Sequence, residues 1–204
     1  GHDAHTAMLL ETANILNQLK DEFEGTVKLI FQPGEEKLPG GASLMIRHGV
    51  LKDVDAIIAQ HVYPDLPCGE VGFYPGEYMA SCDEINIMVR GKGGHAAKIK
   101  ERSNTTVATA KMLCDISELS SEFNKEERDN TIIIAFGSFI ADGTYNVIPD
   151  KVFLKGTMRT FNEDDRKSIK NKIKKICSQI AKTYGVKSRV VIEEGYPVLI
   201  NDVT

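Results

Sequence analysis

Residues 84–90, with the sequence Glu-Ile-Asn-Ile-Met-Val-Arg, carry the pattern that decides the fold of the second half of the chain. Ile85, Ile87 and Val89 recur at every second position, and this spacing predicts a half-buried strand. Further along, apolar spacing predicts five more elements. They are a helix over 105–119, strands over 131–140 and 151–160, a long helix over 164–184 and a strand over 187–193.

The order of these elements is strand, helix, strand, strand, helix, strand. That order is the ferredoxin-like split βαβ arrangement, a two-layer α+β sandwich that can close a core of its own. The glycine-rich residues 91–95 are predicted to form a turn, and residues 122–130 a charged loop. In the long helix, the apolar stripe expected to face the sheet consists of Ile169, Ile173, Ile176 and Ile180.

The first half of the chain carries a different pattern, typical of an α/β domain. Helical spacing covers residues 4–20 and 40–50. The short apolar runs at 27–31 and 54–59 favour buried parallel strands. Weak alternation over 69–80 predicts a hairpin or edge strands.

The change of pattern near Asp83 predicts a domain boundary. We expect a partial α/β domain over 1–82, an inserted α+β domain over 83–193, and a segment over 194–204 that returns to the first domain. The chain starts with Gly-His-Asp, without Met or a signal-peptide pattern. We therefore expect it to be a piece of a longer protein, incomplete at both ends.

Composition narrows the class of protein. The chain has 204 residues, of which 42% are hydrophobic and 26% charged, so a packed core is expected. The net charge of −4 argues against binding to nucleic acid or to an anionic membrane. No apolar run approaches the roughly 20 residues that span a bilayer. The four cysteines form no CxxC pair, which favours idle thiols in a reducing cytoplasm.

Three short motifs in the first half carry residue types that bind metal ions. They contain His2, the adjacent pair Glu35 and Glu36, and His61. Imidazole and carboxylate ligands suit zinc, manganese, cobalt or nickel. In an adjacent glutamate pair, one carboxylate can bind metal while the other handles a proton, as metal-assisted hydrolysis requires.

The predicted strands support a shared site for these motifs. Glu35 and Glu36 follow the run at 27–31, and His61 follows the run at 54–59. Open α/β sheets place their sites at the carboxyl ends of the strands. His5 lies three residues after His2 at a predicted helix start, and its role is left open between ligand, orienting partner and cap. Asp3 is left open between N-cap and orienting partner.

At this point the chain resembles the M20 metallopeptidases, in the amidohydrolase branch of hippurate hydrolases, N-acyl-amino-acid amidohydrolases and auxin-conjugate hydrolases. The resemblance rests on six motifs in family order. They are Gly1-His2-Asp3-Ala4-His5, residues 31–36, Gln60-His61-Val62, residues 91–97, residues 146–149 and residues 156–160. The resemblance implies a metallopeptidase-type α/β catalytic domain with two divalent metal ions per subunit. It also implies that the inserted domain is a lid through which two copies form a homodimer.

The resemblance further implies roles for individual residues. His2, Glu36 and His61 resemble metal ligands, and Glu35 resembles the general base that activates water. His95 and Asn146 match lid residues that contact the substrate or its oxyanion, His95 often across the dimer. Arg159 matches a lid arginine that holds a substrate carboxylate; as a residue at a strand end, it is equally well explained as an exposed charge.

Two residues of the family pattern would lie outside this chain, and one stretch within the chain differs from that pattern. The family's cysteine before the first histidine would precede Gly1, and its last histidine ligand would follow Thr204. After His95, residues 98–102 are largely basic where relatives have Pro-His and a later Asp. We expect metal-dependent hydrolysis of the amide bond of N-acyl amino acids. The alternatives are a related peptidase acting on short peptides, and a non-catalytic dimerisation and lid scaffold with an incomplete metal site.

Overall fold

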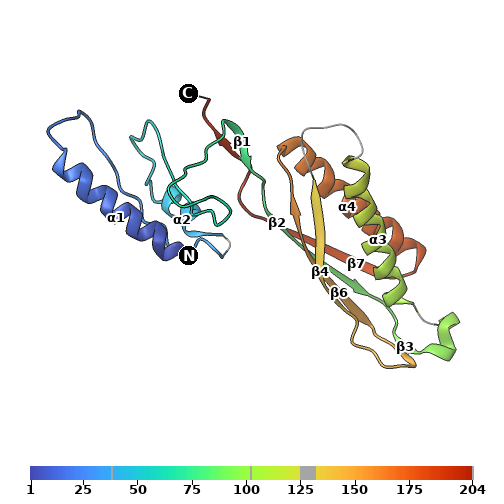
Figure 1. Ribbon diagram of the computed structural model, residues 1–204. Helices are drawn as coiled ribbons and strands as arrows, with labels where there is room; N and C mark the ends of the chain where they lie inside the picture. Colours follow the sequence, from blue (N-terminus) through green and yellow to red (C-terminus); the bar gives the residue numbers. More distant parts are fainter. Residues whose placement is uncertain (38, 102, 125–131, 204) are drawn as a thin grey trace. The chain divides into compact units, whose positions relative to one another are not determined.

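A computed structural model of the chain describes residues 1–37, 39–101, 103–124 and 132–203, without the side chains of 99–101 (Figure 1). It divides into two compact units, Gly1–Phe73 and Tyr74–Thr204. Three predicted features fall partly outside the described residues. They are the charged loop at 122–130, the start of the strand predicted from 131 and the basic stretch at 98–102.

The first unit contains two helices joined by irregular segments. Helix α1 spans His2–Gln18 and helix α2 spans Gly41–Arg47, close to the predicted ranges. Lys28 ties the intervening chain to the turn after α2, because its Nζ donates to the carbonyl oxygens of Val50 and Lys52, each at 2.9 Å.

The prediction of two strands in this unit is wrong. Residues 27–31 and 54–59 have extended or irregular backbone without strand pairing. A strand exists only where a neighbour completes its ladder of hydrogen bonds, and an apolar run does not itself supply one. Several side chains of these runs stay exposed: Val27 by 51%, Ile57 by 66% and Ile58 by 95%. Irregular segments, rather than strand ends, therefore carry Glu35, Glu36 and His61.

The second unit is the predicted α+β sandwich. Its strands are β2 (Asp83–Arg90), β4 (Ile133–Ile140), β6 (Lys151–Arg159) and β7 (Lys187–Glu194), and its helices are α3 (Thr105–Phe123) and α4 (Glu163–Thr183). The four strands lie in the order β4-β6-β2-β7, and every neighbouring pair is antiparallel. With helices after the first and third strands, this is the ferredoxin-like topology, and the prediction is confirmed.

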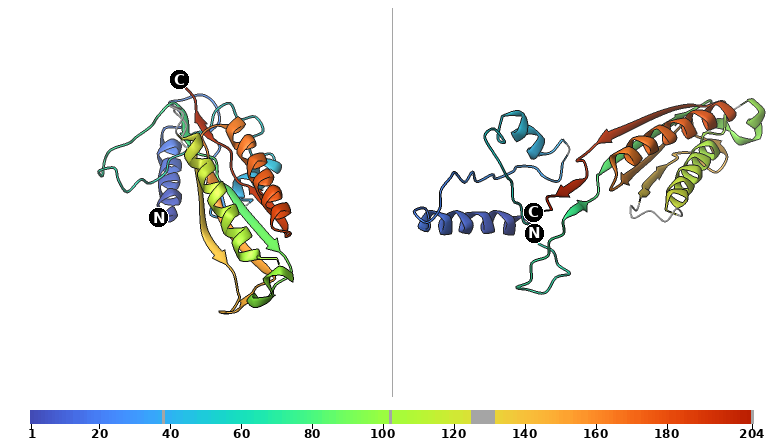
Figure 2. Two further views of the ribbon diagram at one scale, coloured as in Figure 1. Left: turned by 90° about the vertical axis from the view of Figure 1, so that its right-hand side faces the viewer. Right: turned by 90° about the horizontal axis from the view of Figure 1, so that it is seen from above.

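Both helices cover the same face of the sheet (Figure 2). The predicted alternation in β2 is observed, because Ile85, Ile87 and Val89 are buried while Glu84 faces solvent. The predicted stripe of α4 also faces inward. The core that results includes Ile169, Ile173, Ile180, Met112, Ile116, Leu154 and Met158, with Ile176 packed at its margin.

Asparagine caps fix the starts of both helices. The side chain of Asn104 accepts a hydrogen bond from the Val107 N–H at 3.0 Å. The side chain of Asn162 accepts from the N–H groups of Asp164 and Asp165 at 2.9 and 3.0 Å. Such caps satisfy backbone donors that have no partner within the helix.

Two small ribbons flank the sandwich. Strand β1 (Gly76–Met79) pairs with β8 (Leu199–Asn201), so only one edge strand forms within the range 69–80 where we predicted a hairpin or edge strands. Strand β3 (Gly94–His95) pairs with β5 (Val147–Ile148). The predicted turn at 91–95 therefore ends in a short strand.

A buried ion pair holds the start of α4 against the first strand of the sandwich. Arg166 Nε and Nη2 donate to the two Asp83 carboxylate oxygens, each at 2.8 Å, and Asp83 is fully buried. Arg166 also donates to Glu163 and, at 3.2 Å, to the Gly195 carbonyl oxygen. Lys170 Nζ lies 3.3 Å from Asp83. The hydrogen bonds to Asp83 raise the pKa of Arg166 above its ordinary value, so the guanidinium stays charged.

Cysteine reactivity should differ sharply within the sandwich. Burial raises the pKa of the Cys177 thiol to about 12, whereas Cys114 is exposed on α3. Because thiolates are the reactive form, N-ethylmaleimide should label Cys114 in the native protein and Cys177 only after unfolding. Peptide mapping by mass spectrometry measures both sites in one sample. Native labelling of Cys177 at the rate of Cys114 would contradict the burial of Cys177.

No helix in the described part of the chain combines the length and the apolar character needed to cross a membrane.

Candidate metal centre

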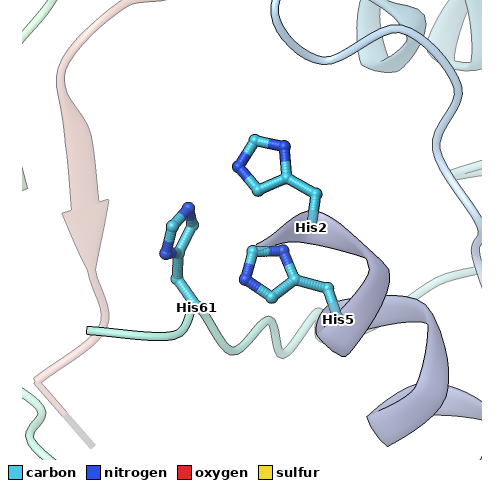
Figure 3. A group of neighbouring side chains, drawn as sticks. All are labelled: His2, His5 and His61. Atoms are coloured by element: carbon cyan, nitrogen blue, oxygen red, sulfur yellow. The ribbon is translucent and has the colours of Figure 1, made fainter. Parts of the chain in front are cut away.

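Three histidines of the first unit gather at one point (Figure 3). His2 and His5 lie in the first turn of α1, and residues three apart on a helix share a face. His61 approaches them from an irregular segment. The ring centroids of His2 and His5 are 5.1 Å apart, those of His2 and His61 5.5 Å, and those of His5 and His61 4.3 Å.

Two carboxylates join His2 from the turn after residue 33. His2 Nδ1 lies 3.7 Å from Glu35 Oε2 and 3.6 Å from Glu36 Oε1. The two glutamate side chains are 55% and 79% exposed, so solvent reaches this side of the cluster. The structure thus brings together all four residues that the motifs predicted near a metal, and it adds His5.

The donor set fits a divalent ion. Ligand atoms of His2, Glu35 and Glu36 lie within 4.8 Å of one another, and those of His2, His5 and His61 form a second such group. Imidazole nitrogen with carboxylate oxygen suits the borderline metals zinc, manganese, cobalt and nickel. The two groups share His2.

Backbone hydrogen bonds orient two of the imidazoles. His61 Nδ1 lies 2.7 Å from the Val62 carbonyl oxygen. The Val62 N–H donates to His5 Nε2 at 3.0 Å. Burial, followed by the neighbouring imidazoles of His61 and His2, lowers the pKa of His5, which favours the neutral ring.

The sequence motifs did not indicate the contact between His5 and Val62. The signal available was the spacing of His2 and His5, which puts both on one helix face.

Asp3 provides negative charge in the first turn of α1, is 94% exposed, and lies 3.6 Å from the Gly1 amino group. Gly1 is the N-cap of α1 and no described side chain caps this helix, so the N-cap role expected for Asp3 is wrong. As an exposed carboxylate in the first turn, Asp3 interacts favourably with the helix dipole instead.

His95 and Asn146 lie side by side in the second unit. The Asn146 amide nitrogen is 3.3 Å from His95 Nε2, and the Ala97 N–H donates to His95 Nδ1 at 3.2 Å. The pairing of β3 with β5 creates this neighbourhood. Gly94 has a φ of +135°, a conformation that glycine adopts without strain, so the glycine-rich turn is needed to deliver His95 there.

Arg159 lies in the four-stranded sheet, at the end of β6. It is the exposed last residue of β6, a strand of nine residues that begins at Lys151. Eight steps of about 3.3 Å place the two ends roughly 26 Å apart. The His95–Asn146 pair lies near the Lys151 end, because β5 directly precedes β6. A single copy of the second unit therefore does not bring Arg159 and His95 together.

Comparison with known protein families matches the whole chain, residues 1–204, to "Peptidase family M20/M25/M40". The chain belongs to peptidase family M20/M25/M40. The family predicted from the six motifs is therefore confirmed. The histidines and glutamates described above lie in an M20 chain, and the roles expected for individual residues stay predictions.

Curated relatives and solved structures agree with the M20 assignment. The chain is 37% identical over 205 residues to the N-acetylcysteine deacetylase of Bacillus subtilis, covering 100% of this chain and 53% of that protein. It is 33% identical over 201 residues to the N-acyl-L-amino acid amidohydrolase of Geobacillus stearothermophilus, covering 98% and 54%.

A solved structure extends the agreement to the fold of the M20 chain. It is that of the YXEP protein of Bacillus subtilis, described as a dinuclear metal binding peptidase from the M20 family. The TM-score is 0.78 at 31% identity, covering 99% of this chain and 50% of that one. The M20 chain thus spans about half the length of the relatives it matches.

Proposed function

We propose that the full-length protein hydrolyses the amide bond of N-acyl amino acids with the help of two divalent metal ions. The observation that carries the proposal is the convergence of His2, Glu35, Glu36 and His61 from three separate segments of the first unit. A cluster of this kind is what metal-assisted hydrolysis needs.

In this proposal His2, Glu36 and His61 hold metal, and bound divalent ions lower the pKa of a coordinated water and polarise the substrate carbonyl. Glu35 takes a proton from the water as its oxygen attacks the carbonyl carbon. As the carbon–nitrogen bond breaks, Glu35 returns a proton to the leaving amine nitrogen. The products are a carboxylic acid and a free amino acid.

The lid residues complete the proposed site. His95, supported by Asn146, stabilises the negative charge that develops on the carbonyl oxygen, and Arg159 binds the free carboxylate of the substrate. Within one lid these groups are roughly 26 Å apart by strand length. They can serve one substrate only if two subunits contribute, which supports a homodimer in which His95 acts on the partner's site.

The sheet of the lid offers a surface for such a dimer. Strand β4 lies at its edge, and Ile133, Phe139 and Ile140 on it are 49%, 39% and 47% exposed. An edge strand has unpaired backbone groups that can bind another strand. We propose dimerisation through the lid, without nucleic-acid or membrane partners, in line with the net charge of −4.

The names of the relatives support the substrate class and leave a peptidase as the nearest alternative. One relative is an N-acetylcysteine deacetylase and another an N-acyl-L-amino acid amidohydrolase, and both names describe removal of an acyl group from an amino acid. A third, at 32% identity, is a thermostable carboxypeptidase of Saccharolobus solfataricus, which favours trying short peptides as substrates too.

We further propose a cytoplasmic location, because all four cysteines are free thiols.

The proposal is tested by removing and restoring metal in the full-length protein. After chelation, hydrolysis of hippurate and of N-acetylated amino acids should vanish and return with added Zn²⁺, Mn²⁺, Co²⁺ or Ni²⁺. His61→Ala should lose metal and activity together, whereas His48→Ala, at an exposed histidine after α2, should keep both. A dimer that binds no metal and hydrolyses none of these substrates would instead support the scaffold alternative.

A further inference from the structure

The peptide groups of Val62 are held from both sides by histidines. Its N–H donates to His5 Nε2 at 3.0 Å, across 57 residues of sequence. Its carbonyl oxygen lies 2.7 Å from Nδ1 of the preceding residue, His61. His5 thus reaches His61 through a single residue of backbone.

These two bonds determine where the protons of both imidazoles sit. A backbone N–H can only donate, so His5 Nε2 carries a lone pair, and the proton of the neutral ring is on Nδ1. A carbonyl oxygen can only accept, so His61 Nδ1 carries a proton. His61 Nε2 is then the nitrogen with a free lone pair, the form in which a histidine binds metal.

We propose that His5 is a positioning residue that fixes the tautomer and direction of the metal ligand His61 by anchoring Val62. The inference rests on the proposed function, because it concerns how the metal site is built. Ligating histidines commonly donate their second N–H to a carboxylate or carbonyl group. Here that partner is a carbonyl on an irregular segment, and irregular backbone by itself would leave its direction free.

The same hydrogen bonds argue against His5 as a ligand. Its Nε2 lone pair is used by Val62, and its Nδ1 carries the proton. Neither nitrogen is available to a metal ion without breaking the bond to Val62. The 4.3 Å between the rings of His5 and His61 is then a packing contact that helps to hold both rings.

The test compares two replacements of His5 in the full-length protein, with Zn²⁺ binding measured by isothermal titration calorimetry. His5→Gln keeps an oxygen that can accept from the Val62 N–H, whereas His5→Leu has similar bulk and no acceptor. Loss of an orienting partner typically weakens metal binding 10–100-fold, so we expect His5→Leu to bind about 30-fold more weakly. His5→Gln should stay within about threefold of wild type by the same reasoning.

Three controls separate this role from others. His61→Ala sets the effect of losing a ligand, and Thr6→Leu places a leucine at the neighbouring exposed position of α1. Thermal unfolding of each metal-free variant shows whether it is folded. If His5→Leu fails to fold, the comparison of His5→Gln with His61→Ala still decides between an acceptor and a ligand.

The possible outcomes are distinct. Rescue by glutamine but not by leucine supports the positioning role. If His5→Gln loses metal as fully as His61→Ala, His5 is a ligand and the inference is wrong. If a folded His5→Leu binds like wild type, the inference is wrong while the proposed function stands. Wild-type protein that binds no Zn²⁺ overturns the proposed function and this inference with it.

Discussion

Glu35→Gln in the full-length protein is expected to lower kcat for N-acyl amino acids by about 10³-fold and to leave metal content at the wild-type level. Glutamine keeps the shape of the side chain but cannot take a proton from water. Since the proposed function assigns the metal ions to His2, Glu36 and His61, metal occupancy should not depend on Glu35. Steady-state kinetics and metal analysis of the same preparations give both numbers.

The adjacent Glu36→Gln is the matched comparison. The two carboxylates lie 3.7 and 3.6 Å from the same nitrogen of His2, so distance alone does not separate their roles. We expect Glu36→Gln to lose metal as well as activity. If Glu35→Gln loses metal and Glu36→Gln keeps it, the two roles are reversed, with Glu35 as the metal ligand and Glu36 as the base. Retained turnover in Glu35→Gln would remove Glu35 as the base.

The second large effect concerns stability. Arg166→Met is expected to destabilise the second unit by about 3 kcal/mol, because Asp83 would remain as a fully buried carboxylate without its guanidinium partner. Lys170, 3.3 Å from Asp83, offsets part of the loss. Urea unfolding, followed by circular dichroism and with the slope compared between variants, measures the change.

A double variant shows whether the loss comes from the unpaired charge. Asp83→Asn combined with Arg166→Met removes both members of the buried pair, so it should cost less than the sum of the single changes. Lys167→Met, at an exposed neighbour on α4, should change stability by less than 0.5 kcal/mol, roughly the usual limit for surface sites. An Arg166→Met protein as stable as Lys167→Met would show that the pair does not support the fold.

The sandwich could be predicted from sequence because its signals are local and its core closes on itself. Alternation of Ile85, Ile87 and Val89 indicates which face of β2 is buried, whatever lies elsewhere in the chain. The stripe on α4 works in the same way. These patterns required only that strands and helices pack on one another, and here they do.

The predictions that failed depended on partners that a pattern cannot specify. The runs at 27–31 and 54–59 are apolar enough for strands, but nothing local indicates whether a neighbouring strand pairs with them. Nor does any local pattern indicate that Arg166, on a lysine-rich helix, is buried against Asp83, which lies 83 residues away in sequence. Contacts across such distances are a property of the fold.

The candidate site shows the same division. The motif types predicted that His2, Glu35, Glu36 and His61 would gather, and the structure places them together. The part that was not predicted is the anchoring of Val62 by His5, since that bond involves a backbone N–H with no signature in sequence. Side-chain chemistry can be read from residue types, whereas backbone partners cannot.

The ends of the sandwich have a consequence for how such proteins evolve. Asp83, where the sandwich begins, is paired directly with Glu194, where it ends, and the β1–β8 ribbon continues this pairing to Gly76 and Asn201. A module whose entry and exit are adjacent can be gained, lost or exchanged at a single point of a host domain. The sandwich is therefore suited to insertion or removal as one unit. Replacing residues 83–194 by a short turn would still allow β1 and β8 to pair.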